Sequence, residues 1–235
     1  MRLAQPLLLL LSASSLLLGG CRSGSQLLYQ PSPLALSTRL PEMEVQVENG
    51  PMDKTEGSLP EDPAQLFKRE TTQNLVEKND SSARFGYLKL QVLEAKASRH
   101  GKALHAIQMV GFLTPSLFGV PLEYFRTHVR AQLQVVDAKG EVLGTYEGTG
   151  DSNIKVAMYH GYSQSMGPRL ADTEALKSAL ANIKPQLDTA ATMLRTRLLS
   201  AGQLGDDAPG VVTGTLYNPA PAAPSPTSSE SADEE

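Results

Sequence analysis

Alternating apolar and polar residues predict two β-strands in the first half of the chain. Between 43 and 47, apolar side chains alternate with glutamate and glutamine, as in a strand with one buried face. The same period of two recurs between 85 and 97, where Leu88, Leu90 and Val92 lie on one side of the expected strand. Both segments are therefore expected to join one sheet.

A β-hairpin is predicted between 126 and 149. Apolar and polar residues alternate before residues 137–140, whose polar side chains and final glycine are typical of a tight turn. We expect the returning strand to end at Gly148 and Gly150, just before Asp151. Residues 154–159 are then expected to add another short strand.

Two helices are predicted, one on either side of the hairpin. The first is expected from Asp62 to about Lys78, with Asp62 as its N-terminal cap and a proline at the next position. The second is expected over 172–200, because leucine, isoleucine and alanine recur there at steps of three and four. That apolar stripe continues past Pro185, which favours one bent helix with Pro185 on its solvent side, ending near Gly202.

Two apolar segments have no clear period. Residues 104–112 are compatible with a buried strand or a short helix, and we favour a strand. Residues 113–125 contain two prolines and a glycine, so we expect an apolar loop. This loop either closes one end of the sheet or forms a partner-contact surface that meets a protein or the membrane. The residues of the possible contact surface are Leu117, Phe118, Val120, Tyr124 and Phe125.

Together these elements predict an α+β domain. We expect a mostly antiparallel sheet of about four to five strands, with two helices on one face. The other face of the sheet, or an edge strand, would then be available to a partner.

The N-terminus has the pattern of an export signal. Arg2 precedes a leucine-rich run that is shorter than a membrane-spanning helix and is interrupted by Pro6 and several serines. The run ends in Leu18, two glycines and Cys21, which is the only cysteine of the chain. We expect cleavage between Gly20 and Cys21.

The segment Leu-Gly-Gly-Cys resembles the lipobox of bacterial lipoproteins, in which the cysteine becomes the first mature residue and carries the acyl chains. Glycine at the second position departs mildly from that pattern. The alternative is an ordinary secretory signal with a stray cysteine. Because Cys21 is followed by Arg22 and Ser23 rather than an aspartate, the resemblance implies an outer-membrane location facing the periplasm. The order of elements and the closing Ala/Leu helix also resemble small envelope lipoproteins, namely peptidoglycan-synthase activators and auxiliary components of ABC transporters.

Composition and charge fix the expected domain limits. We expect a signal peptide over 1–20, a tether over 21–38, one folded domain over 39–203 and a disordered tail over 204–235. Six of the 25 acidic residues lie in that tail, which has no lysine or arginine, so the remainder of the chain is close to neutral. This balance argues against nucleic-acid binding, and the absence of tryptophan argues against an indole-based carbohydrate site.

Candidate catalytic and metal-binding residues do not form a recognisable pattern. The four histidines, at positions 100, 105, 128 and 160, lack carboxylates at metal-ligand spacing, so we expect no metal and no cofactor. His160, in a Tyr-His-Gly-Tyr segment, belongs either to a recognition loop or to a loop packed under the second helix. Glu147 and Asp151 are a possible acid pair, although solvated loop acids are commoner.

The sequence therefore favours a membrane-anchored, non-enzymatic envelope lipoprotein that binds another protein. One alternative is a carrier of lipids or small molecules, with a pocket between the sheet and the bent helix. The other is a cell-wall hydrolase, which would need His128 or His160 beside an acid and a nucleophile.

Overall fold

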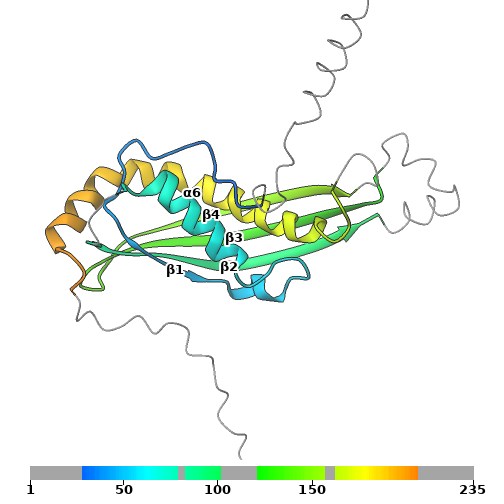
Figure 1. The fold of residues 1–235 in the computed structure, drawn as a ribbon, viewed down its shortest axis with the longest axis horizontal. Coiled ribbons are helices and arrows are strands. Elements are labelled where there is room, and N and C mark those ends of the chain that lie inside the picture. Colours follow the sequence, from blue (N-terminus) through cyan, green and yellow to red (C-terminus); the bar gives the residue numbers. More distant parts are fainter. Residues whose placement is uncertain (1–27, 79–82, 102–120, 157–161, 206–235) are drawn as a thin grey trace, which may run out of the picture. The chain divides into compact units, whose positions relative to one another are not determined.

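A computed structural model of the chain describes residues 28–78, 83–101, 121–156 and 162–205. Four strands form one sheet in the order β1-β2-β3-β4, with two helices lying on the same face (Figure 1). β1 pairs parallel with β2, and the other neighbouring strands pair antiparallel. The strands are β1 (Glu44–Glu48), β2 (Gly86–His100), β3 (Glu123–Asp137) and β4 (Val142–Val156), and the helices are α3 (Asp62–Glu70) and α6 (Gly167–Ala201).

This architecture confirms the predicted α+β class, with a mixed rather than a wholly antiparallel sheet. The alternation of β3 is regular, since Val129, Ala131 and Leu133 are buried while the residues between them face outwards. The inner residues of β2 and β3 share one core with the apolar sides of both helices. No helix in the described part of the chain is long and apolar enough to cross a bilayer.

The predicted hairpin turn between β3 and β4 is confirmed. Gly140 has a φ of 86°, a conformation that side chains other than glycine adopt with strain. The Asp137 carboxylate accepts hydrogen bonds from the backbone N–H groups of Lys139 and Glu141, at 2.9 and 2.8 Å. Local polar contacts of this kind explain why the turn was readable from the sequence.

The predicted end of the returning strand is wrong, because β4 continues through Gly148 and Gly150 to Val156. Both glycines lie where α6 touches the sheet. A Cβ atom at Gly148 would lie 2.4 Å from the Ala179 carbonyl oxygen, and one at Gly150 would lie 2.1 Å from that of Ala175. These glycines therefore permit close helix–sheet packing, and they leave no space for a ligand between α6 and β4 at these positions.

α6 is a single helix that contains Pro185, as the continuous apolar stripe predicts. It begins at Gly167, five residues before the expected start, and its first turn contains a proline. Pro185 is exposed, while Ile183 and Leu187 on the other side are buried. Gly202 follows the helix with a φ of 92° and ends it.

The first predicted helix is shorter than expected. α3 ends at Glu70 and continues as a π-helical turn, η2 (Thr71–Leu75), in which the Val76 N–H donates to the Thr71 carbonyl. The prediction that Asp62 caps α3 is also wrong: Glu61 occupies the cap position, and the Asp62 carboxylate is buried instead. A short 3₁₀ helix, η1 (Gly50–Lys54), follows β1.

Residues 28–38, which we expected to belong to the tether, pack against the domain. Leu28, Tyr29 and Leu36 are each no more than 6% exposed and belong to the main core. The backbone N–H of Leu36 donates to the Asn74 carbonyl at 3.0 Å, so the segment is also hydrogen-bonded to η2. Leu28, Tyr29 and Leu36 hold this stretch on the domain, although its proline and serine content is typical of a linker.

Candidate functional site

The structure tests only part of the predicted partner-contact surface. Leu117, Phe118 and Val120 lie outside the described residues, as do Gly20 and Cys21 and the whole of 104–112. Tyr124 and Phe125 belong to β3 rather than to a loop. Phe125 is only 7% exposed and packs against Val156 and Ala171, so its predicted contact role is wrong. The half-buried Tyr124 lies beside His100 on the outer face of the sheet.

The histidines that the structure describes do not form a reactive centre. His128 Nδ1 lies 2.8 Å from Asp151 Oδ1 on the exposed outer face of the sheet. Among the described residues, no serine or threonine hydroxyl forms a hydrogen bond with His128. The same residues contain no group of three histidine, cysteine, aspartate or glutamate side chains that could hold a metal ion. Glu147 accepts from Gln132 at 3.0 Å, so the two acids of the supposed pair each have their own partner. His105 and His160 lie outside the described residues.

The outer face of the sheet is polar, and several of its charges are paired. Lys89 contacts Glu48 at 2.6 Å, and Lys96 contacts Glu94. At the edge of β4, α6 supplies two hydrogen bonds to backbone carbonyls: Asn182 donates to Thr149 and Gln186 to Glu147, each at 2.7 Å. α6 therefore covers part of an edge that would otherwise be free to pair with another strand.

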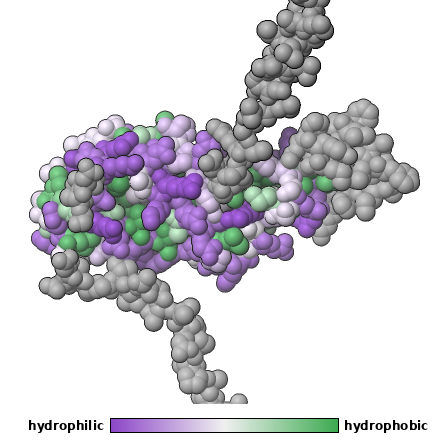
Figure 2. All heavy atoms as spheres, viewed as in Figure 1, coloured by the Kyte–Doolittle hydropathy of each residue, from purple (hydrophilic) through white to green (hydrophobic). Residues whose placement is uncertain are grey.

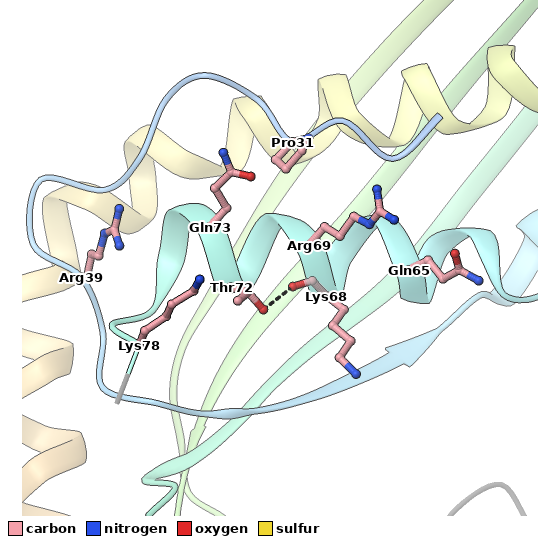
Figure 3. Close-up of a pocket in the computed structure, with 8 residues that line it drawn as sticks. All are labelled: Pro31, Arg39, Gln65, Lys68, Arg69, Thr72, Gln73 and Lys78. Carbon is pink, nitrogen blue, oxygen red and sulfur yellow. Dashed lines mark hydrogen bonds between the residues drawn. The ribbon is translucent and has the colours of Figure 1, made fainter. Parts of the chain in front are cut away.

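A groove of about 700 Å³ runs along α3 and η2 on the helical side of the sheet (Figure 3). Arg69 and Gln73 project from the helical turns towards the segment that carries Pro31, and Gln65 lies near the start of α3 (Figure 3). Arg39 and Lys78 lie at the far end, and Lys68 points to the β1 side of α3. The groove is lined by Pro31, Arg39, Gln65, Lys68, Arg69, Thr72, Gln73 and Lys78.

Four cations and no carboxylate are among the residues that line the groove, with the Lys68 side chain extending to the β1 side of α3. Arg39, Lys68, Arg69 and Lys78 take part in none of the ion pairs of the described residues, whereas eight other lysines and arginines each pair with an acid. The adjacent Glu77 is already held by Arg195 at 2.9 Å. The helical side is broadly hydrophilic (Figure 2). Within the part of the chain that the structure describes, this groove combines positive charge with an absence of ion-pair partners.

Two buried polar clusters hold the walls of this groove together. In the first, Lys184 of α6 pairs with Glu70 of α3 and also donates to Ser32 and to the Leu34 carbonyl. Glu70 accepts a further bond from Asn74 at 2.9 Å and one from the Ser32 backbone, also at 2.9 Å. Three segments far apart in the sequence thus meet at one charged pair.

The second cluster joins Tyr29, Asp62 and Arg169. The Arg169 guanidinium donates to both Asp62 oxygens, at 2.7 and 2.8 Å, and the Tyr29 hydroxyl donates to Asp62 at 2.5 Å. Burial alone raises the pKa of Asp62, but these hydrogen bonds outweigh it and hold the pKa below its ordinary value. The Tyr29 ring lies 5.3 Å from the Arg69 guanidinium, which links this cluster to the groove.

Asp62→Asn is expected to lower the free energy of unfolding at pH 7 by about 1–3 kcal/mol, because it removes a buried charged group that accepts four hydrogen bonds, two from Arg169 and one each from Tyr29 and the Leu59 backbone. The folded-state pKa of Asp62 lies below the unfolded value of about 3.9. Its stabilisation is therefore complete above that unfolded value and is lost as the pH falls through the folded pKa. Urea unfolding of wild type and variant across this range should show converging stabilities in acid. If the stability difference between wild type and Asp62→Asn stays constant with pH, the prediction is wrong. Glu61→Gln, at the exposed neighbouring position, is the control for removing a carboxylate near the start of α3.

No sequence pattern identified the groove, because its cations are not clustered in the sequence and one wall belongs to the stretch taken for a tether. Arg39 and Lys78 line the same groove only because residues 28–40 cross α3 and η2. The one available signal was the burial potential of Leu28, Tyr29 and Leu36, which indicates that this stretch packs.

Neither a family model nor a curated protein matches the chain. Among solved structures, it is similar to protein XCC0632 from Xanthomonas campestris, of the family DUF330, with 8% sequence identity and a TM-score of 0.27. That likeness covers 72% of this chain and 90% of the other. At this TM-score it supports no argument about fold or function.

Proposed function

We propose that this chain is a lipid-anchored, non-enzymatic protein of the bacterial envelope whose α+β domain binds another envelope protein. The observation that carries the proposal is the sequence from Leu18 to Cys21, a leucine and two glycines before the only cysteine. A thiol without a partner in the same chain cannot form an internal disulfide, and acylation would consume it. Arg22 and Ser23 after it support placement in the outer membrane, facing the periplasm.

The described domain supports a binding role more than a catalytic one. The His128–Asp151 pair is exposed, and no nucleophile in the described part of the chain is bonded to it. The buried ion pairs Asp62–Arg169 and Glu70–Lys184 join segments of the chain that lie far apart in the sequence. Within the described residues, two surfaces are available for contacts, the polar outer face of the sheet and the basic groove along α3. A protein tethered to a membrane can use such surfaces without chemistry of its own.

Metabolic labelling with a palmitate analogue tests the anchor. We expect wild type to be labelled and to remain with the membranes, and Cys21→Ala to lose label to background, since no other thiol is available for acylation. Stable anchoring needs more than one acyl chain, each buried CH₂ contributing about 0.8 kcal/mol. Ser23→Ala, two residues away, is the control that should keep both label and location.

The proposal fails if wild type is unlabelled, or if its mature N-terminus is a residue other than Cys21. Crosslinking the same cells and recovering the wild-type chain tests the binding role. A discrete partner band that disappears with Cys21→Ala is expected, because the anchor holds the domain next to its partner. Recovery of the chain without any partner above background would contradict the binding role while leaving the anchor in place.

A further inference from the structure

We propose that the groove along α3 binds the phosphate groups of anionic glycerophospholipid headgroups, in the membrane that holds Cys21. The inference rests on the proposed function, because the acyl anchor is what brings the groove to a lipid surface. It assigns to the domain a second, polar contact with its own membrane.

The charge of the groove selects the chemistry of the ligand. Arg39, Lys68, Arg69 and Lys78 line it without a carboxylate among the lining residues. Arginine presents a planar set of donors that matches two phosphate oxygens, while lysine acts as a point charge. A group with net negative charge and several acceptor oxygens therefore fits the groove, and a headgroup whose ammonium cancels the phosphate charge fits less well.

Neutral donors and a fixed guanidinium add to this charge. Gln65 and Gln73 lie along the same wall, and their side-chain amide groups can donate to phosphate oxygens. The Thr72 hydroxyl already donates to the Lys68 carbonyl at 2.8 Å. The Tyr29 ring, itself buried, lies against Arg69 and restricts its position. Thr72 and Gln73 belong to the π-helical turn η2, a rare geometry that is frequent at functional sites.

The groove lies close to the anchor along the chain. Ten residues separate Cys21 from Pro31 in the groove wall, and even a fully extended chain of that length spans at most about 36 Å. The described domain begins at Leu28, only three residues before Pro31. A lipid-anchored Cys21 therefore keeps this wall near the headgroups.

An exposed apolar residue lies on the same segment. Leu34 is 64% exposed, more than any other large apolar side chain of the described residues, and it lies between Pro31 and Arg39 in the sequence. An exposed apolar side chain on a segment that also carries cations is a combination by which peripheral proteins contact the boundary between headgroups and acyl chains. The charge of the groove, its closeness to Cys21 along the chain and the exposure of Leu34 all favour contact with the same lipid surface.

Amine footprinting of the lipidated full chain tests the inference. The chain is reconstituted in nanodiscs of phosphatidylcholine alone, or of phosphatidylcholine with phosphatidylglycerol, and lysine acetylation rates are read by mass spectrometry. We expect Lys68 and Lys78 to react at least about fivefold more slowly in the phosphatidylglycerol discs, the factor that corresponds to one basic residue near an anionic surface. Lys155, on the outer face of the sheet, should react equally in both.

Matched double variants identify the groove as the cause. Arg39→Gln/Arg69→Gln should abolish the difference at Lys68 and Lys78, and Arg126→Gln/Arg130→Gln, with the same loss of charge on the outer face, should keep it. Both groove side chains are outside the buried ion pairs, and equal melting temperatures will establish that the variants fold. About 1 M NaCl, where the Debye length is about 3 Å, should also remove the protection.

Three results would overturn the inference, and they are distinguishable. If the chain does not enter either disc, the anchor itself is wrong and the proposed function fails with it. If the chain enters both discs and the two lysines react equally, the anchor stands and the groove does not bind anionic lipid. If inorganic phosphate protects the lysines equally well in phosphatidylcholine discs, the groove is a site for soluble phosphate rather than for lipid.

Discussion

Lys184→Ala is expected to lower the free energy of unfolding by about 3–5 kcal/mol, the usual result of leaving one partner of a buried ion pair without compensation. Glu70 and Lys184 are 2% and 5% exposed, so water does not easily replace the missing ammonium. Ser32 and the Leu34 carbonyl would lose a donor as well. The variant should therefore loosen residues 28–38 together with the core.

Urea unfolding measures this effect, and two further variants make it specific. Lys177→Ala removes a partly exposed lysine of the same helix, paired at 3.4 Å with Glu174, and should cost less than about 1 kcal/mol. Glu70→Gln/Lys184→Met removes both charges, and should recover most of the lost stability because no isolated charge remains in the core. If the double variant is no more stable than Lys184→Ala, the penalty does not come from an unpaired glutamate.

Gly150→Ala is expected to lower the free energy of unfolding by about 3 kcal/mol, at the upper end of the range for overpacked cores. The added Cβ would meet backbone atoms of α6 on two sides, the Ala175 carbonyl oxygen at 2.1 Å and the Ala179 nitrogen at 2.3 Å. A side chain can relieve such a contact by rotating, but backbone atoms cannot, so the helix must move away from β4. Calorimetry should show a melting temperature lower by about 6–12 °C.

Gly144→Ala in the same strand is the matched control. Its added Cβ would meet only the distal part of the Tyr146 side chain, at 2.7–3.0 Å, and that side chain can rotate. A melting temperature close to that of wild type is expected. If the two alanine variants are equally unstable, contact between the added Cβ and α6 is not the cause of the instability.

Local patterns predicted the secondary structure well where the cause was local. The alternation in β2 and β3, the turn at 137–140 and the apolar stripe of α6 all reflect contacts between near neighbours, and the structure confirms them. Gly148 and Gly150 misled the prediction, because a glycine that admits a helix resembles one that ends a strand. Only the position of α6 distinguishes the two cases.

The same error hid the pairing of His128 with Asp151. The hairpin turn fixes the register of β3 against β4, and that register places these two residues opposite each other once β4 is extended beyond Gly150. Asp62 was misread for a related reason, since a capping residue and a buried ligand of Arg169 have the same local sequence. Long-range partners, at separations of about a hundred residues, cannot be read from local spacing.

The cover that α6 provides for β4 has a consequence for folding. α6 follows all four strands in the sequence, so a chain that emerges from its N-terminus can complete the sheet before this helix is available. Asn182 and Gln186 have then not yet reached the carbonyls of Thr149 and Glu147, and the edge of β4 is open to pairing with another copy of the chain. Once α6 has packed, its asparagine and glutamine occupy these carbonyls and oppose that association.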